Sequence, residues 1–495
     1  IVFGDWSSDV CSSDLENGRS LQLVNFADFS KSPWWIKIET DKPGMYRINP
    51  SQLTGFPLSD IDPKSFRLFT STGKILPFTI LNPGNAFREV PIRVVGEEDQ
   101  SFDANDYIIF YGSNRTGYDT NDLAQATPLY HNPYSNNTVY WLTFAGDFSS
   151  PPLRIQNAST LDSWSSEHTS HREVVHVETE NHRREIEGLT WYMTRMFGSG
   201  VQDFAYDVSL PDLDPAEPQT LQLNMIQEKV SSSLQHKLSV HINDPQMSST
   251  GQAVWYGTNV LNYTMSTSSF VSGSNRFVIR LLRDRTINYY FDYYRVTYGK
   301  KLIKSNAQYN VNQTASIASS GAKYNFTGSA TGVETYQVVS HDVIRRIPVS
   351  AVSGGFNFAA AGNVDCTYYV TKPEELFSPV SIQYKEPNIL TDTASSYDNI
   401  IVCASEFLPQ ANELALAYLQ NWGLRSKVVS QNDVFDQFNG GHPDPLAIRQ
   451  FLRYAYYNYQ SPKIKTLTLL GQGTIDWRNY SRSEEHTSEL QSPNT

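Results

Sequence analysis

The sequence predicts a mainly β N-terminal region of β-sandwich-like domains, followed by the first half of a doubly wound α/β domain. Short alternating strands separated by turn residues recur from residue 21 to about residue 380. After residue 397 the pattern changes to strand, helix, strand, helix, strand. The length of 495 residues fits about three domains at roughly 150 residues per domain.

We divide the β-rich part into domains at residues 21–153, 154–305 and 306–396. The expected strands are 34–39, 45–48, 66–69, 75–80, 90–95, 107–111, 138–144, 204–210, 221–226, 238–242, 276–282, 289–298, 322–326, 335–339, 343–349 and 366–370. Residues 289–298 (YYFDYYRVTY) are apolar on both faces, as in a strand that is covered on both sides.

Residues 397–480 are assigned to an incomplete α/β domain. Strands are expected at 399–404, 426–429 and 464–470, and helices at 408–422 and 444–459. Gly423 suits the cap after the first helix, and Asp444 with Pro445 suits the start of the second. Three parallel strands alone leave open sheet edges, so we expect the natural protein to continue.

The two ends of the chain have the character of an artefact. Residues 5–15 read DWSSDVCSSDL and residues 482–492 read RSEEHTSELQS. One DNA segment, read on opposite strands, encodes both, and this DNA resembles a short-read sequencing adapter. We therefore exclude residues 1–20 and 481–495 from the fold prediction. Both natural termini are then missing, and the lack of a signal peptide says nothing about export.

The composition argues against several classes of protein: disordered chains, proteins with membrane-spanning helices and nucleic-acid-binding proteins. Aromatic residues make up 13% and charged residues 18%, which excludes a disordered chain. No apolar run approaches the roughly 18 residues of a membrane helix. The net charge is −12, or −7 without the two terminal segments, and no basic cluster suggests nucleic acid as a partner. Outside those segments Cys366 and Cys403 remain, which we expect to be buried thiols, with a single disulfide as the alternative.

Ligands and catalytic groups of open α/β sheets lie beyond the carboxyl ends of the strands. This rule selects residues 405–407, 430–441 and 471–479. The last loop supplies the candidate active-site rim, which consists of Gly471, Gln472, Gly473, Thr474 and Asp476. Two glycines permit a tight turn, and the Asp can accept hydrogen bonds. The alternative to an active-site rim is a plain strand-to-helix turn without a chemical role. The loop is not a phosphate loop, because no GK[ST] follows it.

Histidines supply the other candidates. His168, His171, His176 and His182 lie near Glu173 and Glu178, but their spacings match no tight metal signature, so we expect a solvated strand and turn, with a metal site as the alternative. His442 and Cys403 are a conceivable dyad. Because Cys403 lies within an apolar strand, inert packing of its thiol is the expectation.

Five stretches together resemble the gingipain-like cysteine peptidases, and among them the sortases of the type IX secretion system of Bacteroidetes. They are GMYRI at residues 44–48, HVE at 176–178 with WYMTRMF at 191–197, DNIIV at 398–402, GG at 440–441 with DPLAIRQFL at 444–452, and LLGQGTIDWRN at 469–479. The last stretch is close to the family's LLGDGSYDxRN. Gln472 stands where the family has Asp, which puts a carboxylate role at that position in doubt.

The resemblance implies a caspase/gingipain-like α/β domain and acyl-transfer chemistry. A thiolate attacks the cargo carbonyl and a His protonates the leaving amine. An amine of anionic lipopolysaccharide then resolves the thioester. In the family the catalytic His and Cys follow the LLGDGSYD stretch, and nothing in this sequence matches them. We therefore assign no catalytic residue and expect this chain to be inactive.

The implied partners are the C-terminal signal domains of type IX secretion cargo, anionic lipopolysaccharide and an outer-membrane PorV-like β-barrel. The implied location is the exported, outer-membrane cell surface. The family resemblance also suggests calcium, although no ligands for it can be placed. Two alternatives remain: another gingipain-like cysteine endopeptidase, or a non-enzymatic surface adhesin whose Trp255 and Tyr256 stack on glycans.

Overall fold

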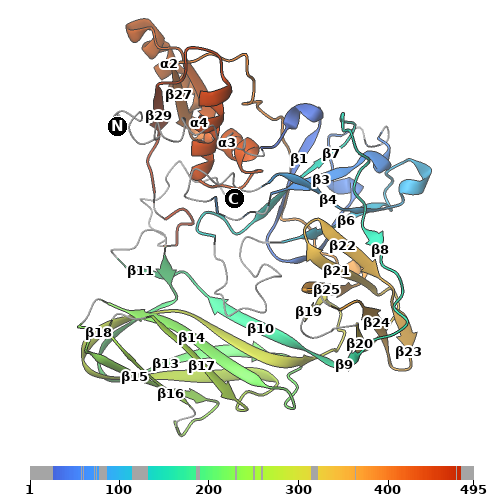
Figure 1. Cartoon of the computed structure of the whole chain (residues 1–495), viewed down its shortest axis with the longest axis vertical. Helices are drawn as coiled ribbons and strands as arrows, with labels where there is room; N and C mark the ends of the chain where they lie inside the picture. The colour runs from blue at the N-terminus through green and yellow to red at the C-terminus, as the bar shows by residue number, and fades with distance from the viewer. Residues whose placement is uncertain are drawn as a thin grey trace, which may run out of the picture.

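The computed structural model combines three β-rich regions with one α/β unit. It describes residues 26–56, 58, 61–71, 73, 75–76, 86–113, 132–184, 190–228, 231–248, 251–257, 260–313, 321–362, 364–474 and 476–480. The two terminal adapter-like segments and most of the strand expected at 75–80 lie outside these residues. Figure 1 shows the α/β unit at one end of the molecule and the second β region at the other. The predicted fold class is confirmed.

The first β region contains two antiparallel sheets. The larger sheet has the order β26-β1-β7-β3-β4, with β26 Ser381–Tyr384, β1 Trp35–Thr40, β7 Thr138–Thr143, β3 Arg67–Thr70 and β4 Arg88–Val90. The smaller sheet has the order β2-β6-β5, with β2 Gly44–Ile48, β6 Tyr107–Gly112 and β5 Arg93–Val95. Apolar side chains from both sheets, such as Ile38, Phe110 and Leu142, form one core. Strand β26 joins this sheet from far along the sequence.

Gly44 shows why the GMYRI stretch begins with glycine. Its φ is +158°, and a Cβ there would lie 2.5 Å from the ring of Phe377. The following residues, Met45 and Tyr46, are fully buried. Glycine thus lets the strand pass close beneath the segment that leads to β26.

The second β region is organised around one 29-residue strand, β18 Gly273–Lys301. On one side β18 pairs with β13 Thr194–Leu210 and then β10 Ser170–Glu178. On the other it pairs with β15 Gln235–Ile242 and then β14 Gln219–Gln227. Strands β16 Gly251–Tyr256 and β17 Leu261–Thr267 complete the sheet, and β11 His182–Arg183 pairs with β12 Trp191–Tyr192. The strands expected at 276–282 and 289–298 are therefore one, because no breaker residue separates them.

The third β region contains two further sheets. One has the order β19-β25-β21-β22-β8, and the other has the order β23-β24-β20-β9. Their strands are β8 Gln156–Asn157, β9 Ser166–His168, β19 Tyr309–Gln313, β20 Ala322–Thr327, β21 Glu334–Ser340, β22 Val343–Ile347, β23 Ser350–Val352, β24 Gly355–Ala360 and β25 Cys366–Thr371. The short strands β8 and β9 precede the second region in sequence, yet they pair in parallel with β22 and β20.

Short 3-10 helices connect several strands. They are η1 Phe29–Lys31, η2 Pro50–Gln52, η4 Pro63–Ser65, η5 Glu97–Asp99, η7 Pro373–Glu375 and η8 Ser405–Phe407. Residues of the first and third regions share a core that includes Met45, Ile109 and Tyr369. The exit of β18 is fixed by Lys304, whose Nζ lies 2.7 Å from Oε2 of Glu375, with both side chains nearly inaccessible to solvent.

The α/β unit has three parallel strands in the order β28-β27-β29. They are β27 Asn399–Cys403, β28 Ser426–Ser430 and β29 Thr466–Leu470. Along β27, Ile400 and Val402 face helices α3 Gln431–Phe438 and α4 Leu446–Asn458, whereas Ile401 and Cys403 face α2 Leu408–Trp422. This alternation explains the continuous apolar run, since both faces of the strand are covered.

Two details of this unit differ from the prediction. Helix α3 occupies much of residues 430–441, where no helix is predicted, and Ser430 caps it by accepting a hydrogen bond from the Asp433 amide (3.1 Å). Its buried apolar residues are Val434, Phe435 and Phe438. They form an apolar pattern that is too short to predict a helix from the sequence. Helix α4 begins at Leu446, and the Asp444 carboxylate accepts from the Leu446 amide (2.8 Å).

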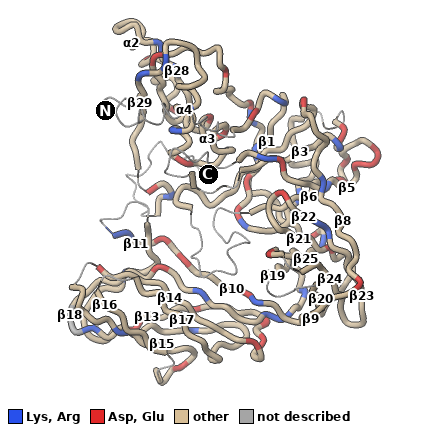
Figure 2. The backbone as a smooth tube through the Cα atoms, viewed as in Figure 1, with Lys and Arg blue, Asp and Glu red and all other residues tan. Residues whose placement is uncertain are grey.

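Acidic and basic residues are interspersed along the chain in all regions (Figure 2). Among the described residues, no helix is long and apolar enough to cross a membrane.

The buried Lys304–Glu375 pair leads to a stability prediction. Replacing Glu375 with Ala leaves a buried ammonium without its counter-ion, which costs about 3–5 kcal/mol. We expect the urea midpoint to fall accordingly. The matched control is Asp207→Ala, which removes the exposed partner of Arg276 (3.5 Å) and has a much smaller effect, since solvent screens that pair. Equal urea midpoints for the two variants would contradict a stabilising role of the buried Lys304–Glu375 pair.

Candidate functional site

The carboxyl ends of the three parallel strands meet at one edge of the sheet. Cys403 pairs in register with both Ser430 and Leu470, so each strand ends in the same row. Helix η8 follows β27, and α3 follows β28 without an intervening loop. A long hydrogen bond from Asn432 Nδ2 to Ser405 Oγ (3.4 Å) links these two exits. The edge selected from the sequence is thus formed by the three expected segments.

The candidate rim after β29 divides into an exposed and a buried half. Gly471, Gln472 and Gly473 are exposed, whereas Asp476 is only 3% exposed. Gly471 has a φ of +140°, which suits glycine at this turn. Gln472 therefore presents a neutral amide to solvent at the position where the related motif has Asp.

Asp476 stabilises the backbone of its own loop. Its Oδ1 accepts from the Tyr480 amide (2.8 Å) and its carbonyl accepts from the Asn479 amide (3.1 Å). Its own amide donates to Oγ1 of Thr474 (3.0 Å). The carboxylate proposed as a hydrogen-bond acceptor at the rim thus serves the turn, and Gln472 is the polar side chain of the rim that is exposed.

Cys403 and His442 do not form a dyad. The Cys403 thiol is buried, lies 3.8 Å from the carbonyl of Val429, and has a pKa raised by burial. The His442 ring, fully buried, accepts from the Val139 amide through Nε2 (2.9 Å). Its Nδ1 lies 3.0 Å from the carbonyl of Asn439 and 2.9 Å from Ser71 Oγ. Both nitrogens are thus engaged, which fixes the neutral tautomer with the proton on Nδ1.

These His442 contacts are part of a larger interface between the first β region and the segment around α3 and α4. We call this interface the seat. The indole of Trp141 donates to the carbonyl of Gly440 (2.9 Å), and the Leu76 amide donates to Oδ2 of Asp444 (2.8 Å). Lys37 pairs with Asp436 (2.8 Å). The first β region therefore holds the helices behind the sheet edge by directional bonds. The sequence gives no sign of this, since the partners lie some 300 to 400 positions apart.

Lys385, in the segment that leads into the α/β unit, forms two further ion pairs with helix α3. Its Nζ lies 3.2 Å from Asp433 and 3.3 Å from Asp436. Burial alone would lower the pKa of Lys385, but the two carboxylates raise it above its usual value. The lysine thus stays charged and neutralises helix α3.

The histidines near β10 do not converge on a metal site. His171 is buried beside Lys300, and burial together with this cation lowers its pKa to about 3. His176 Nε2 donates to the Glu178 carboxylate (2.9 Å), and its ring centroid lies 4.8 Å from that of Tyr293. His168 stacks on Tyr324, whereas His182 is exposed. The strand β10 is less solvated than expected, because His171 is buried and most of the other residues are half-buried, whereas the turn that leads to His182 is largely exposed. Among the described residues no group of three metal-ligating side chains gathers.

Neither thiol forms a disulfide, as expected, and both Cys366 and Cys403 are buried. Of the two aromatic residues considered for glycan stacking, Trp255 is buried and donates to Gln227 (3.1 Å), while Tyr256 is half exposed. The paired stacking platform is therefore not present.

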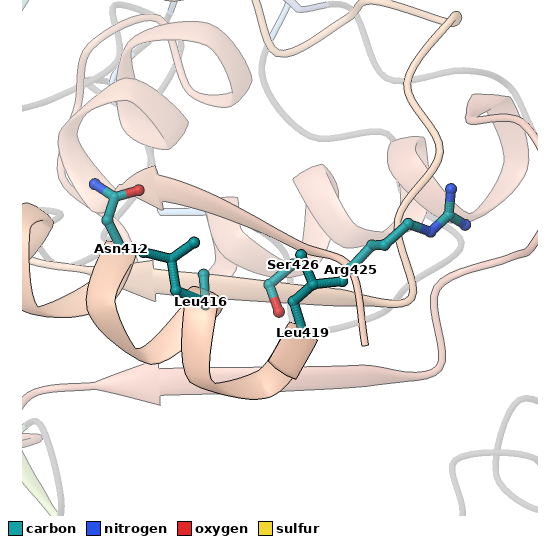
Figure 3. Close-up of a pocket in the computed structure, with 6 residues that line it drawn as sticks. Asn412, Leu416, Leu419, Arg425 and Ser426 are labelled. Carbon is teal, nitrogen blue, oxygen red and sulfur yellow. The ribbon is translucent and has the colours of Figure 1, made fainter. Parts of the chain in front are cut away.

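A shallow hollow of about 330 Å³ lies between α2 and the start of β28. Asn412, Leu416 and Leu419 line it from the helix, and Ser426 lines it from the strand (Figure 3). Arg425 extends away from the two leucines and bonds to Asp398 (3.3 Å). Because Ser426 begins β28, the hollow lies away from the carboxyl ends of the strands and is not the candidate site.

Comparisons with known proteins agree with the resemblance drawn from the sequence. Residues 392–492 match the model of peptidase family C25. The structure is similar to that of dimeric latent PorU from Porphyromonas gingivalis, with a TM-score of 0.70 and 20% identity over 91% of this chain and 42% of that chain. This confirms a PorU-like fold, whose last part is similar to peptidase family C25. The chain spans less than half the length of that protein.

A second solved structure gives only a weak likeness. The CBM36-1 domain of a multidomain xylanase from the hindgut metagenome of Trinervitermes trinervoides has a TM-score of 0.18 and 10% identity, over 25% of this chain and 95% of that one. This score is too low to establish a shared fold. No curated protein matches the sequence.

The His442 contacts generate a prediction. In His442→Leu the buried Val139 amide loses its acceptor, which costs about 1–3 kcal/mol of unfolding free energy. Urea unfolding followed by circular dichroism measures the change. The control is His182→Leu, at an exposed histidine on β11, which we expect to leave the midpoint in place. Equal stability of the His442 variant and the unaltered chain would show that the Val139–His442 hydrogen bond does not stabilise this interface.

Proposed function

We propose that this chain is the front part of a gingipain-type cysteine peptidase that works as a sortase in type IX secretion. The observation that carries the proposal is the position of the LLGQGTIDWRN stretch. It begins in the last two residues of the third parallel strand and continues beyond it, at the edge where open α/β sheets place their chemistry, within the segment that matches family C25. The PorU-like fold over most of the chain supports the same function.

The proposed reaction is acyl transfer. A cysteine thiolate attacks the scissile carbonyl of the cargo, the C–N bond breaks, and a histidine protonates the departing amine. An amine on anionic lipopolysaccharide then attacks the thioester, which releases the thiolate and leaves an amide. Neither Cys366 nor Cys403 is suited to this role, because burial raises the pKa of both thiols. We propose that the reacting His and Cys follow residue 480, and that the chain alone is inactive.

The proposed partners follow from the same assignment. They are the C-terminal signal domains of secreted cargo, anionic lipopolysaccharide and a PorV-like outer-membrane β-barrel, at the cell surface. Calcium binding belongs to the proposal only through the family resemblance, and the described residues offer no cluster of ligands for it.

The test compares this chain with the product of the uninterrupted gene. Both are incubated with a cargo protein that carries a C-terminal signal domain and with an added amine. We expect the chain alone to be inert, and the longer product to release the signal domain and form the amine conjugate. Mass spectrometry of the new carboxyl end identifies the conjugate.

Substitutions at this chain's own thiols sharpen the test. In the longer product Cys403→Ser and Cys366→Ser are expected to retain activity, since neither thiol reacts, while replacement of the downstream cysteine abolishes it. Hydrolysis without conjugate would favour an ordinary endopeptidase over a sortase. Loss of activity in Cys403→Ser with unchanged circular dichroism, or cysteine-dependent cleavage by the chain alone, would refute the assignment.

A further inference from the structure

Helix α2 is apolar on the side that faces the sheet and also on the side that faces solvent. Ala411 and Leu414 pack against the sheet. On the solvent side Leu416 is 59% exposed, Leu419 is 49% exposed and Trp422 is 67% exposed. These three follow at intervals of three residues, so they form one stripe along the helix. Figure 1 shows α2 at the end of the α/β unit that points away from the β-rich regions. A contiguous apolar surface of this kind marks an interaction site.

The stripe combines a protruding ring with a hollow. Trp422 protrudes at the end of the helix, and the ring of Tyr418 lies 5.5 Å from the indole and supports it. The hollow described above lies beside the preceding turns, where Asn412, Leu416 and Leu419 line it (Figure 3). Its volume of about 330 Å³ is large enough to hold one indole ring. The same helix thus carries a knob and a hole that fits it.

A second copy of this chain is the occupant that supplies the matching knob. In a twofold dimer each copy presents the same surface to the other, so knob and hole meet twice. A twofold axis that passes Leu419 places Leu416 opposite the partner's Trp422, because both residues lie three positions from Leu419. We propose that the solvent side of α2 is a homodimer contact, in which two α2 helices pack antiparallel about Leu419 and each Trp422 fills the hollow of the other copy.

The charges around the stripe permit this pairing. Glu413 is the only charged residue within α2. It lies six positions from Leu419, so the two Glu413 side chains of a dimer are about 18 Å apart along the helix axes. This exceeds the Debye length of about 8 Å at physiological ionic strength, and their repulsion is screened. Arg425, at the margin of the hollow, is bonded to Asp398 (3.3 Å) and extends away from the leucines (Figure 3).

The size of the contact sets its strength. Three side chains on each copy form a small interface, and interfaces below about 1,200 Å² in total are typical of transient association. We therefore expect a dimer that forms and dissociates with protein concentration.

The test measures the oligomeric state of the full chain by sedimentation velocity, at concentrations up to about 1 mM. We expect a monomer–dimer equilibrium. Trp422→Ala should raise the dissociation constant at least about 30-fold, because aromatic side chains that fill a partner's pocket dominate the affinity of an interface. The matched control is Trp164→Ala, at a tryptophan that is 36% exposed and precedes β9, which leaves the constant unchanged. Circular dichroism establishes that both variants are folded.

Cysteine cross-linking tests the antiparallel arrangement. The background is Cys11→Ser, in which the remaining thiols, Cys366 and Cys403, are buried. Leu419→Cys places two thiols beside the twofold axis, and mild oxidation is expected to give a disulfide-linked dimer. Glu413→Cys should give none, because a disulfide needs Cα atoms within about 7 Å of each other.

Three results would overturn the proposal. The first is a chain that stays monomeric up to about 1 mM, which would leave this face to a different occupant. The second is a dimer whose affinity does not change in Trp422→Ala. The third is equal cross-linking of Leu419→Cys and Glu413→Cys, which would show that the two helices do not pair about Leu419.

Discussion

The seating of the α3–α4 segment in the first β region is the constraint on which the sheet edge depends. His442, Asp444 and the Gly440 carbonyl each meet a directional partner from Val139, Leu76 or Trp141. These hydrogen bonds are buried. A buried donor or acceptor that loses its partner costs more free energy than a formed hydrogen bond contributes. Small displacements are therefore unfavourable, and the carboxyl ends of β27, β28 and β29 are held in one orientation relative to the β-rich part.

The β-rich part therefore has a positional role for the chemistry proposed at the edge. The third region shares a core with the first, and the Lys304–Glu375 pair fixes the point where the second region rejoins the third. Residues 477–480 then reach from the edge back to the second region, where Tyr480 contacts Trp191.

Local pattern was enough to predict most of the elements. The apolar run of β27, the glycine after α2 and the Asp-Pro start of α4 each follow from rules that act within a few residues. The long-range pairing of β26 and of the parallel strands β8 and β9 could not be predicted, because their partners lie more than 150 positions away in the sequence. The rim stays a prediction, and the burial of Asp476 and the partners of His442 required the tertiary structure.

Hydrogen exchange at two amides tests the central claim most directly. The amides of Leu76 and Val139 lie in the first β region, but their acceptors lie in the α/β unit. If the two parts form one structure, both amides exchange as slowly as those of the central strand β27. Exchange of both amides at the rate of exposed loops, with β27 still protected, would show that the unit is not held and would contradict the account.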